Sequence, residues 1–99
     1  MTTFSVVRFR IKSGREAEFL NAHRAGKAKW PRLIKGHIIK TGERSYCLVC
    51  EWENGSALIA ARPQMIATLD TFRDTLEDLG GGLGVTDAAP GDSVVDLNG

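Results

Sequence analysis

The sequence lacks the features that direct a protein to a membrane or to nucleic acid. Its 99 residues carry 13 basic and 12 acidic side chains, so the formal net charge is only +1. Nucleic acids and anionic membranes require a concentrated basic surface, and neither is expected as a partner. No apolar run approaches the roughly 20 residues of a membrane-spanning helix. The first ten residues place Arg8 and Arg10 within their apolar stretch and lack a signal-peptide layout, so a cytoplasmic location is expected.

Residues that bind metals or carry out redox chemistry are also scarce. Cys47 and Cys50 have C-x-x-C spacing, but they fall inside a predicted strand. Successive strand residues point to opposite faces, so the pair is expected to form two buried, inert thiols, with a redox or metal role as the less favoured alternative. His23 and His37 have no third ligand at metal spacing. Neither a metal nor another cofactor is therefore expected.

The clearest strand pattern in the chain is SYCLVCEWE, residues 45–53. One face of this strand is apolar throughout and consists of Tyr46, Leu48, Cys50 and Trp52. Aromatic and β-branched residues suit a pleated surface, and apolar groups occur on both faces. Such a strand requires hydrogen-bonding partners on both edges and cover on at least one face.

Hydrophobic periodicity predicts further strands and helices around this strand. Strands are predicted at residues 4–11, 33–41, 45–53 and 93–97, and helices at residues 13 to about 27 or 29, 57–62 and 63–79. Ser13 can cap the first helix, and Glu16 three residues later completes a capping box. Asn54 can cap the second helical region. Pro63 is expected to kink or restart that region, and Gly80 is expected to end it in a left-handed conformation.

The order of these elements predicts an α+β protein of the ferredoxin-like type, β-α-β-β-α-β. Residues 41–44 have turn chemistry, with Gly42 free to take a positive φ, so the flanking strands are expected to form an antiparallel hairpin. Connection rules place the first strand beside the third strand of the sequence and both helices on one sheet face. Residues 1–99 are expected to form a single domain, with residues 83–99 as an irregular tail that contains a short edge strand.

The sheet face opposite the helices is expected to be apolar as well. It carries Phe4 and Val6, and it is expected to carry Tyr46 or Leu48 as well. An uncovered apolar face of this size is typical of an association surface, so a two-fold homodimer through this face is predicted.

Three stretches resemble the antibiotic biosynthesis monooxygenase family of dimeric α+β barrels. They are VVRFRIKSGREAEF at residues 6–19, CEWENGSAL at residues 50–58 and RPQMIATLDTFRDTLEDLG at residues 62–80. The resemblance implies a homodimer whose sheets pack face to face and a pocket between the helices and the sheet of each subunit. Some members of the family oxidise polyaromatic substrates with dioxygen and without metal or flavin. Others bind and degrade haem, and many have no known activity.

The haem-degrading branch of the family uses an Asn on the first strand, a Trp in the second helical region and a His one helix later. The matching positions here are Val7, Ala61 and Thr71, and no histidine follows His37. These side chains cannot ligate iron or take those polar roles. Haem degradation is therefore not expected.

A cofactor-free oxygenase needs a pocket for its aromatic substrate, a base or hydrogen bond that favours the substrate anion, and exclusion of water. His37 and Tyr46 are the candidate catalytic residues, because imidazole titrates near neutrality and a phenol can donate a hydrogen bond. The candidate substrate-binding residues are Trp30, Arg62, Met65 and Phe72. Packing alone is the simpler interpretation of Trp30 and Tyr46. For His37, the simpler interpretation is a solvated position on the surface.

The leading hypothesis is a homodimer related to cofactor-independent monooxygenases that acts on or binds a small aromatic or apolar molecule. The alternative is a non-catalytic ligand-binding or structural homodimer. His23 is expected to be a hydrogen-bonded core or interface residue. Arg8 and Arg10 can hold an anionic substrate, but the two are expected to pair with Glu51 or Glu53.

Overall fold

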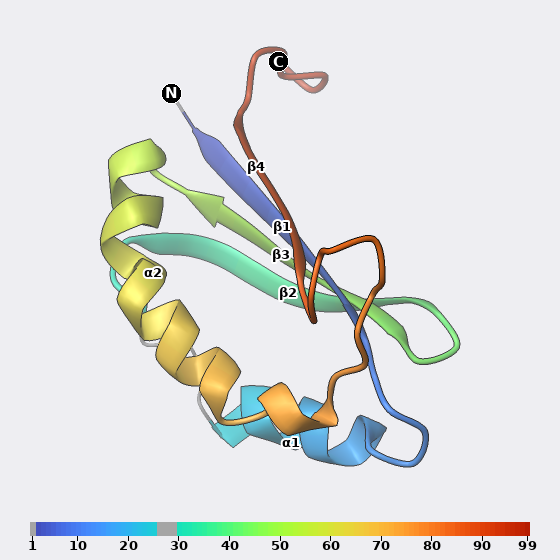
Figure 1. The fold of residues 1–99 in the computed structure, drawn as a ribbon. Helices are drawn as coiled ribbons and strands as arrows, with labels where there is room; N and C mark the ends of the chain where they lie inside the picture. The colour runs from blue at the N-terminus through green and yellow to red at the C-terminus, as the bar shows by residue number, and fades with distance from the viewer. Residues whose placement is uncertain (1, 26–29) are drawn as a thin grey trace.

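The computed structural model describes residues 2–25 and 30–99. Four antiparallel strands form one sheet in the order β2-β3-β1-β4, with two helices packed against it (Figure 1). The elements are β1 (Thr3–Arg10), α1 (Glu16–Ala25), β2 (Leu33–Gly42), β3 (Ser45–Trp52), α2 (Gly55–Asp70), the 3-10 turn η1 (Arg73–Thr75) and β4 (Asp87–Asp92). The predicted ferredoxin-like α+β fold is confirmed. In the described part of the chain, neither helix is long and apolar enough to cross a bilayer.

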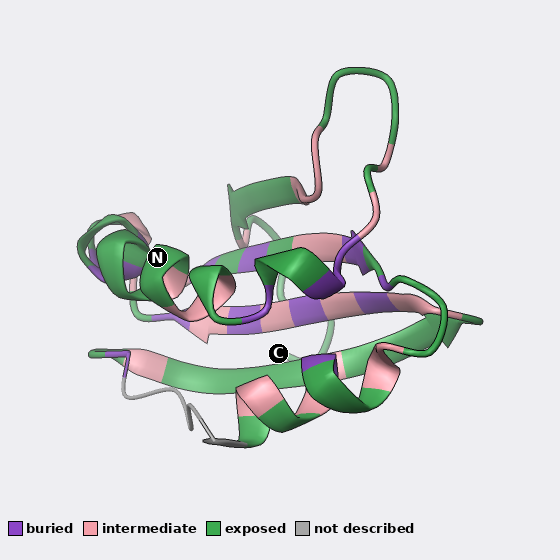
Figure 2. Ribbon diagram, turned by 60° about the horizontal axis from the view of Figure 1, so that its bottom comes forward, coloured by how far each residue is buried: buried purple, intermediate pink, exposed green. Residues whose placement is uncertain are grey.

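The central strands pair as their sequence patterns predict. β1 lies between β3 and β4, and its register places Val7 opposite Leu48 and Phe9 opposite Tyr46. Buried and half-buried residues alternate along β3, whereas most of β2 is exposed (Figure 2). The buried set of β3, which includes Tyr46 and Leu48, faces the helices, because alternate strand residues point to the same side. The expectation that Tyr46 or Leu48 lies on the opposite sheet face is therefore wrong.

An aromatic core fills the space between the helices and the sheet. Phe19 of α1 meets Phe9 of β1 and Phe72 edge to face, with ring centroids 5.5 and 5.3 Å apart. Trp52 and Phe19 are fully buried. The residues that the helices contact lie at alternate positions of β1 and β3, so they point to the same side of the sheet. Both helices therefore cover the same face.

The first helix begins later than the sequence predicts. Gly14 has a φ of +80°, and this turn separates Ser13 from the first helical residue, Glu16. Ser13 is therefore not the cap, and the predicted capping box is wrong. The Glu16 carboxylate instead accepts a hydrogen bond from the hydroxyl of Tyr46. The predicted end of this helix, near residue 27 or 29, lies outside the described residues.

The second helix runs through Pro63 without interruption. Asn54 caps it as predicted, because its side-chain oxygen accepts a 2.9 Å hydrogen bond from the backbone N–H of Ala57. Pro63 is inside α2, so the predicted restart of a new helix at this residue is wrong. The proline removes the hydrogen bond to the carbonyl of Ile59, and both residues are exposed, so water can solvate that carbonyl.

The same helix ends earlier than predicted, at Asp70 rather than residue 79. The Thr71 backbone N–H closes its last turn on the Thr68 carbonyl at 3.0 Å. Phe72 then leaves helical geometry with a φ of −131° and buries its ring to 3% exposure. Burial of Phe72 outweighs the helical propensity of the residues that follow. Gly80 has a positive φ, but it lies in a later turn and does not cap the helix.

The turn between β2 and β3 places its positive φ at a different residue from the one predicted. Arg44 takes a φ of +57°, and Gly42 does not take a positive φ. The Arg44 guanidinium donates a 3.0 Å hydrogen bond to the carbonyl of Ile11 and pairs with the carboxylate of Glu77. These contacts hold the left-handed conformation of a non-glycine residue.

The last strand lies earlier in the chain than residues 93–97, where the sequence pattern predicts an edge strand. β4 has the sequence DAAPGD, whereas residues 93–97 form no strand. Its register places Ala88 opposite Val7 and Pro90 opposite Ser5. Pro90 is tolerated because β4 is an edge strand, so its missing N–H does not interrupt a second ladder. Long-range pairing with β1 overrides the stronger local propensity of SVVDL.

The sheet face opposite the helices, hereafter the open face, carries apolar residues in the middle of its strands. Phe4 and Val6 are 39% and 36% exposed, and Val6 is paired with Val49 in register. Arg8 on this face forms a 3.2 Å ion pair with Asp87 of β4. The expected pairing of Arg8 with a β3 carboxylate is therefore wrong, because the neighbouring edge strand supplies the partner.

Candidate functional site

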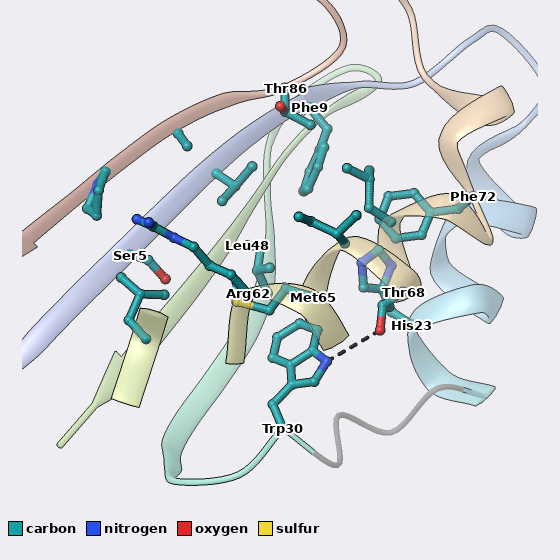
Figure 3. Close-up of a pocket in the computed structure, with 16 residues that line it drawn as sticks. Ser5, Phe9, His23, Trp30, Leu48, Arg62, Met65, Thr68, Phe72 and Thr86 are labelled. Carbon is teal, nitrogen blue, oxygen red and sulfur yellow. Dashed lines mark hydrogen bonds between the residues drawn. The ribbon is translucent and has the colours of Figure 1, made fainter. Parts of the chain in front are cut away.

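A cavity of about 260 Å³ lies between α2 and the helix-facing side of the sheet (Figure 3). β1 and β3 contribute its base through Val7, Phe9 and Leu48, and α2 contributes one side. The residues from α2 recur at three- or four-residue spacing and so share one helix face; they include Leu58, Arg62, Met65 and Leu69. The lining is mostly aliphatic and aromatic, which suits an apolar ligand. The cavity volume is near the lower end of the usual range for ligand pockets, so the ligand is expected to be small.

The four predicted substrate-binding residues all line this cavity: Trp30, Arg62, Met65 and Phe72. Trp30 follows α1 in the sequence, Arg62 and Met65 project from α2, and Phe72 lies just beyond α2. The end of the second helical region at Asp70 is what allows Phe72 to turn into this space.

Neither predicted catalytic residue lines the same cavity. Tyr46 is 4% exposed and its hydroxyl bonds Glu16, which lies 3.4 Å from Lys40. This hydrogen bond is the main reason that the pKa of Tyr46 is raised and that of Glu16 is lowered. Tyr46 therefore belongs to a polar cluster beside the start of α1.

His37 is exposed, and it is paired with Val49 in register. It therefore lies on the sheet face opposite to the one that carries Leu48. It borders a second cavity of about 160 Å³, which shares His23, Trp30 and Thr68 with the larger cavity. The predicted base is thus near the site but outside the larger cavity.

His23 is the one histidine that lines the larger cavity. Its Nδ1 lies 2.8 Å from the carbonyl oxygen of Phe19, one helical turn earlier. A carbonyl only accepts hydrogen bonds, so Nδ1 carries the proton and Nε2 presents a lone pair. Nε2 is buried and has no hydrogen-bond partner among the residues that the structure describes. A buried acceptor without a partner is uncommon, so this nitrogen calls for an explanation.

The surroundings of His23 keep its imidazole neutral. Burial lowers the pKa below the usual 6.5, and this effect outweighs the opposing hydrogen bond to Phe19. The ring also packs against Phe19 and Phe72, with centroids 4.6 and 4.4 Å away. A neutral imidazole held in this way can accept a proton from a bound hydroxyl group.

Sequence reasoning gave His23 no chemical role. The available signal was a single polar residue on the otherwise apolar stripe of the first helix, four residues after Phe19. That signal does not distinguish a core histidine from a base. The structure adds two observations: His23 borders the cavity, and its buried Nε2 has no hydrogen-bond partner among the described residues.

Trp30 closes one side of the cavity and is 8% exposed. Its indole N–H donates a 3.3 Å hydrogen bond to the Thr68 hydroxyl, which in turn donates to the Gln64 carbonyl at 3.0 Å. Figure 3 shows the indole below Thr68 and close to His23. The side chain is therefore held in place by α2, and it lines both cavities.

Arg62 lies at the other end of the cavity from His23 (Figure 3). It is the only Lys, Arg, Asp or Glu among the described residues that line the cavity. No three His, Cys, Asp or Glu side chains in residues 2–25 and 30–99 come together in a group that could hold a metal ion. The arrangement supplies a neutral base, a cation and an aromatic surface.

No protein-family model matches the sequence, and no curated protein matches it. Solved structures do match. SnoaB, a cofactor-independent oxygenase from Streptomyces nogalater, is 16% identical with a TM-score of 0.74, and the alignment covers 97% of this chain and 96% of SnoaB. A Nitrosomonas europaea protein assigned to the antibiotic biosynthesis monooxygenases is 12% identical with a TM-score of 0.77, over 94% of this chain and 90% of its own.

A conserved protein from Methanosarcina mazei Go1 gives the same TM-score of 0.77 at 12% identity, over 93% of this chain and 92% of that protein. At these identities the comparisons establish the fold. The chain has the α+β fold of antibiotic biosynthesis monooxygenase-like proteins, as the sequence resemblance predicted.

Proposed function

We propose that this protein belongs to the antibiotic biosynthesis monooxygenase family and is a cofactor-independent oxygenase of small hydroxyaromatic molecules. The observation that carries the proposal is a histidine, His23, that lines a mostly apolar cavity and whose buried Nε2 has no partner among the described residues. SnoaB, which shares the fold, is a cofactor-independent oxygenase. Fold alone is a weak argument for function, so the proposal depends on this base and its surroundings.

The first step is deprotonation of the substrate hydroxyl. His23 Nε2 accepts the proton, and the resulting aryloxide is electron-rich enough to give one electron to dioxygen. Superoxide then combines with the aryloxyl radical at the carbon para to the oxygen, and a C–O bond forms. The proton on His23 passes to the peroxide, and elimination of water leaves a quinone. One oxygen atom enters the product, the other leaves as water, and the substrate supplies all the electrons.

The other residues of the cavity would hold the substrate and limit its contact with water. Phe9 and Phe72 offer ring edges and faces against which a planar substrate can stack. Trp30 limits the access of water on the side of His23. Exclusion of water protects the radical pair and the peroxide from side reactions.

The functional unit that we propose is a homodimer. Phe4 and Val6 expose apolar surface on the open face, and helices cover only the other face. Two copies related by a two-fold axis would cover these faces mutually. This arrangement leaves both cavities on the outer, helix-covered sides of the paired sheets.

Oxygen uptake in the presence of 1-naphthol, with 1,4-naphthoquinone as the expected product, tests the function. The wild-type protein should consume one dioxygen per quinone formed. His23→Gln, which keeps a polar side chain without a basic nitrogen, should reduce the rate by about 10²-fold or more, as expected for loss of a general base.

His37→Gln is the matched control, because His37 lies outside the larger cavity. A loss of turnover in His37→Gln with full turnover in His23→Gln would reject His23 as the base. Binding of the naphthol without oxygen uptake would reject the oxygenase and assign the cavity to a ligand-binding protein.

A further inference from the structure

Arg62 differs from most arginines of this protein because its guanidinium has no side-chain partner among the described residues. Six of the eight arginines donate to a carboxylate or amide oxygen of another side chain. Arg62 and Arg10 are the two without such a partner among the described residues. Arg10 lies on the open face of β1, whereas Arg62 lines the cavity.

The cavity therefore carries a positive charge that the protein leaves uncompensated. None of its described lining residues is an aspartate or glutamate, and His23 is neutral because burial lowers its pKa. Arg62 is exposed, and the residues around it in the cavity lining are mostly apolar, so its guanidinium is the charged group that an anion entering the cavity would meet. The guanidinium can bind a carboxylate through two parallel hydrogen bonds.

Arg62 and His23 are far enough apart to contact opposite ends of one ligand. Arg62 precedes Thr68, the α2 residue that bonds Trp30 near His23, by six residues or about 9 Å of helical rise. Figure 3 shows the Arg62 guanidinium extended away from His23, toward the side of the cavity where Ser5 lies.

Ser5 adds a buried polar group at the Arg62 end. It is 4% exposed and lines the cavity. Its hydroxyl oxygen accepts a 3.0 Å hydrogen bond from the indole N–H of Trp52. A hydroxyl can donate while it accepts, so Ser5 can also donate to an anion placed beside Arg62.

We propose that the cavity selects hydroxyaromatic carboxylates, with the carboxylate bound by Arg62 and Ser5 and the hydroxyl directed at His23 Nε2. This inference rests on the proposed function and specifies its substrate class. Arg62 fixes the orientation of the ring, so the hydroxyl that loses its proton is the one remote from the carboxylate. A neutral aromatic of the same size lacks this anchor.

Titration calorimetry with two matched ligands tests the inference without turnover. The ligands are 5-hydroxy-1-naphthoic acid and its carboxamide, measured under nitrogen at pH 7.5. Wild-type protein should bind the acid about tenfold more tightly than the amide, in line with one charge-assisted hydrogen-bonding pair at a partly exposed site. Arg62→Gln should remove this preference, and Arg62→Lys should retain part of it because lysine cannot bind the carboxylate in a bidentate manner.

Arg10→Gln is the matched control, since it removes the other arginine without a partner from the opposite face of the sheet. It should keep the tenfold preference for the acid. Equal affinity of the wild-type protein for acid and amide, no binding of either, or a preference that survives Arg62→Gln would each overturn the inference.

The same samples, returned to air, separate this inference from the proposed function. Binding of the acid through Arg62 without oxygen uptake would leave the anion site in place and reject the oxygenase. Turnover of 1-naphthol without any preference for the acid would keep the oxygenase and reject the anion site.

Discussion

Trp30 stacks on Trp52 with ring centroids 6.3 Å apart and ring planes at 21°. Each indole N–H has its own partner, since Trp30 donates to Thr68 and Trp52 donates to Ser5. The stack thus joins the residues after α1 to the sheet beside the cavity. These are the only two tryptophans in the chain, so tryptophan fluorescence reports directly on this region.

Thr68→Val should destabilise the protein by about 1 kcal/mol. Valine preserves the shape of threonine but leaves the mostly buried Trp30 N–H without its acceptor, and an unmade hydrogen bond of this kind costs about 1–3 kcal/mol when fully buried. Urea denaturation followed by tryptophan fluorescence measures the change. Thr41→Val, at an exposed strand position, should change the free energy of unfolding by no more than about 0.5 kcal/mol.

His23 should make the folded protein less stable in mild acid. Its folded-state pKa lies below the unfolded value of 6.5, so the unfolded chain binds a proton first as the pH falls. The contribution of the neutral imidazole is therefore complete above about pH 6.5 and is lost progressively below it, at no more than about 1.4 kcal/mol per pH unit. Urea denaturation between pH 8 and pH 5 measures this slope.

The variant His23→Gln has no imidazole to titrate and should show a shallower loss of stability below pH 6.5. His37→Gln should keep the wild-type slope if His23 is its source. An identical slope in wild type and His23→Gln would show that other groups control the acid response.

Val6→Glu should convert the proposed dimer to monomers. The substitution places a carboxylate in the middle of the open face, where a two-fold contact would bring two such charges together without water. Analytical ultracentrifugation at micromolar concentration distinguishes the two states. Ile59→Glu is the control, because Ile59 is 61% exposed on α2 and lies away from the sheet. A wild-type protein that sediments as a monomer would reject the dimer.

The two cysteines should differ in reactivity with iodoacetamide. Cys50 is fully buried, and burial raises the pKa of its thiol to about 11, so it should remain unlabelled in the folded protein at pH 8. Cys47 is half-buried on the open face and should react first. Mass spectrometry after timed labelling measures both rates. Faster labelling of Cys47 in Val6→Glu than in wild type is expected if a second copy covers this face.

Pro63→Ala should stabilise the protein by about 1–2 kcal/mol. Proline in a helix interior is about 3 kcal/mol less favourable than alanine, and part of this difference is offset because proline also restricts the unfolded chain. Thermal or urea denaturation tests the gain. Gln64→Ala, at the exposed neighbouring position, should produce a change of a few tenths of a kcal/mol. A destabilised Pro63→Ala would show that the proline has a packing role.

The strands that carry strong alternation were predictable, and the boundaries set by distant contacts were not. The pattern of residues 45–53 led directly to β3, and the turn at residues 41–44 led to the β2-β3 hairpin. β4 escaped prediction because Ala88 and Pro90 have little strand propensity and depend on pairing with β1. The end of α2 was missed because burial of Phe72, rather than a local stop signal, decides it.

The candidate site shows the same division. Trp30, Arg62, Met65 and Phe72 are large or charged side chains that were expected to bind a substrate, and all four line the cavity. His23 was not predicted as a site residue, because the direction of its ring nitrogens depends on the helix turn that accepts Nδ1–H and on the rings packed around it.

The sequence by itself determined the order of strands and helices, the apolar face of the central strand and the separation of the two cysteines. These properties follow from periods of two and of 3.6 residues, which are local. Only the tertiary structure decided which histidine lines the cavity, which arginine of the cavity lining has no side-chain partner among the described residues, and which segment completes the sheet. Each of these depends on contacts between residues distant in the chain, and their energies do not appear in any local pattern.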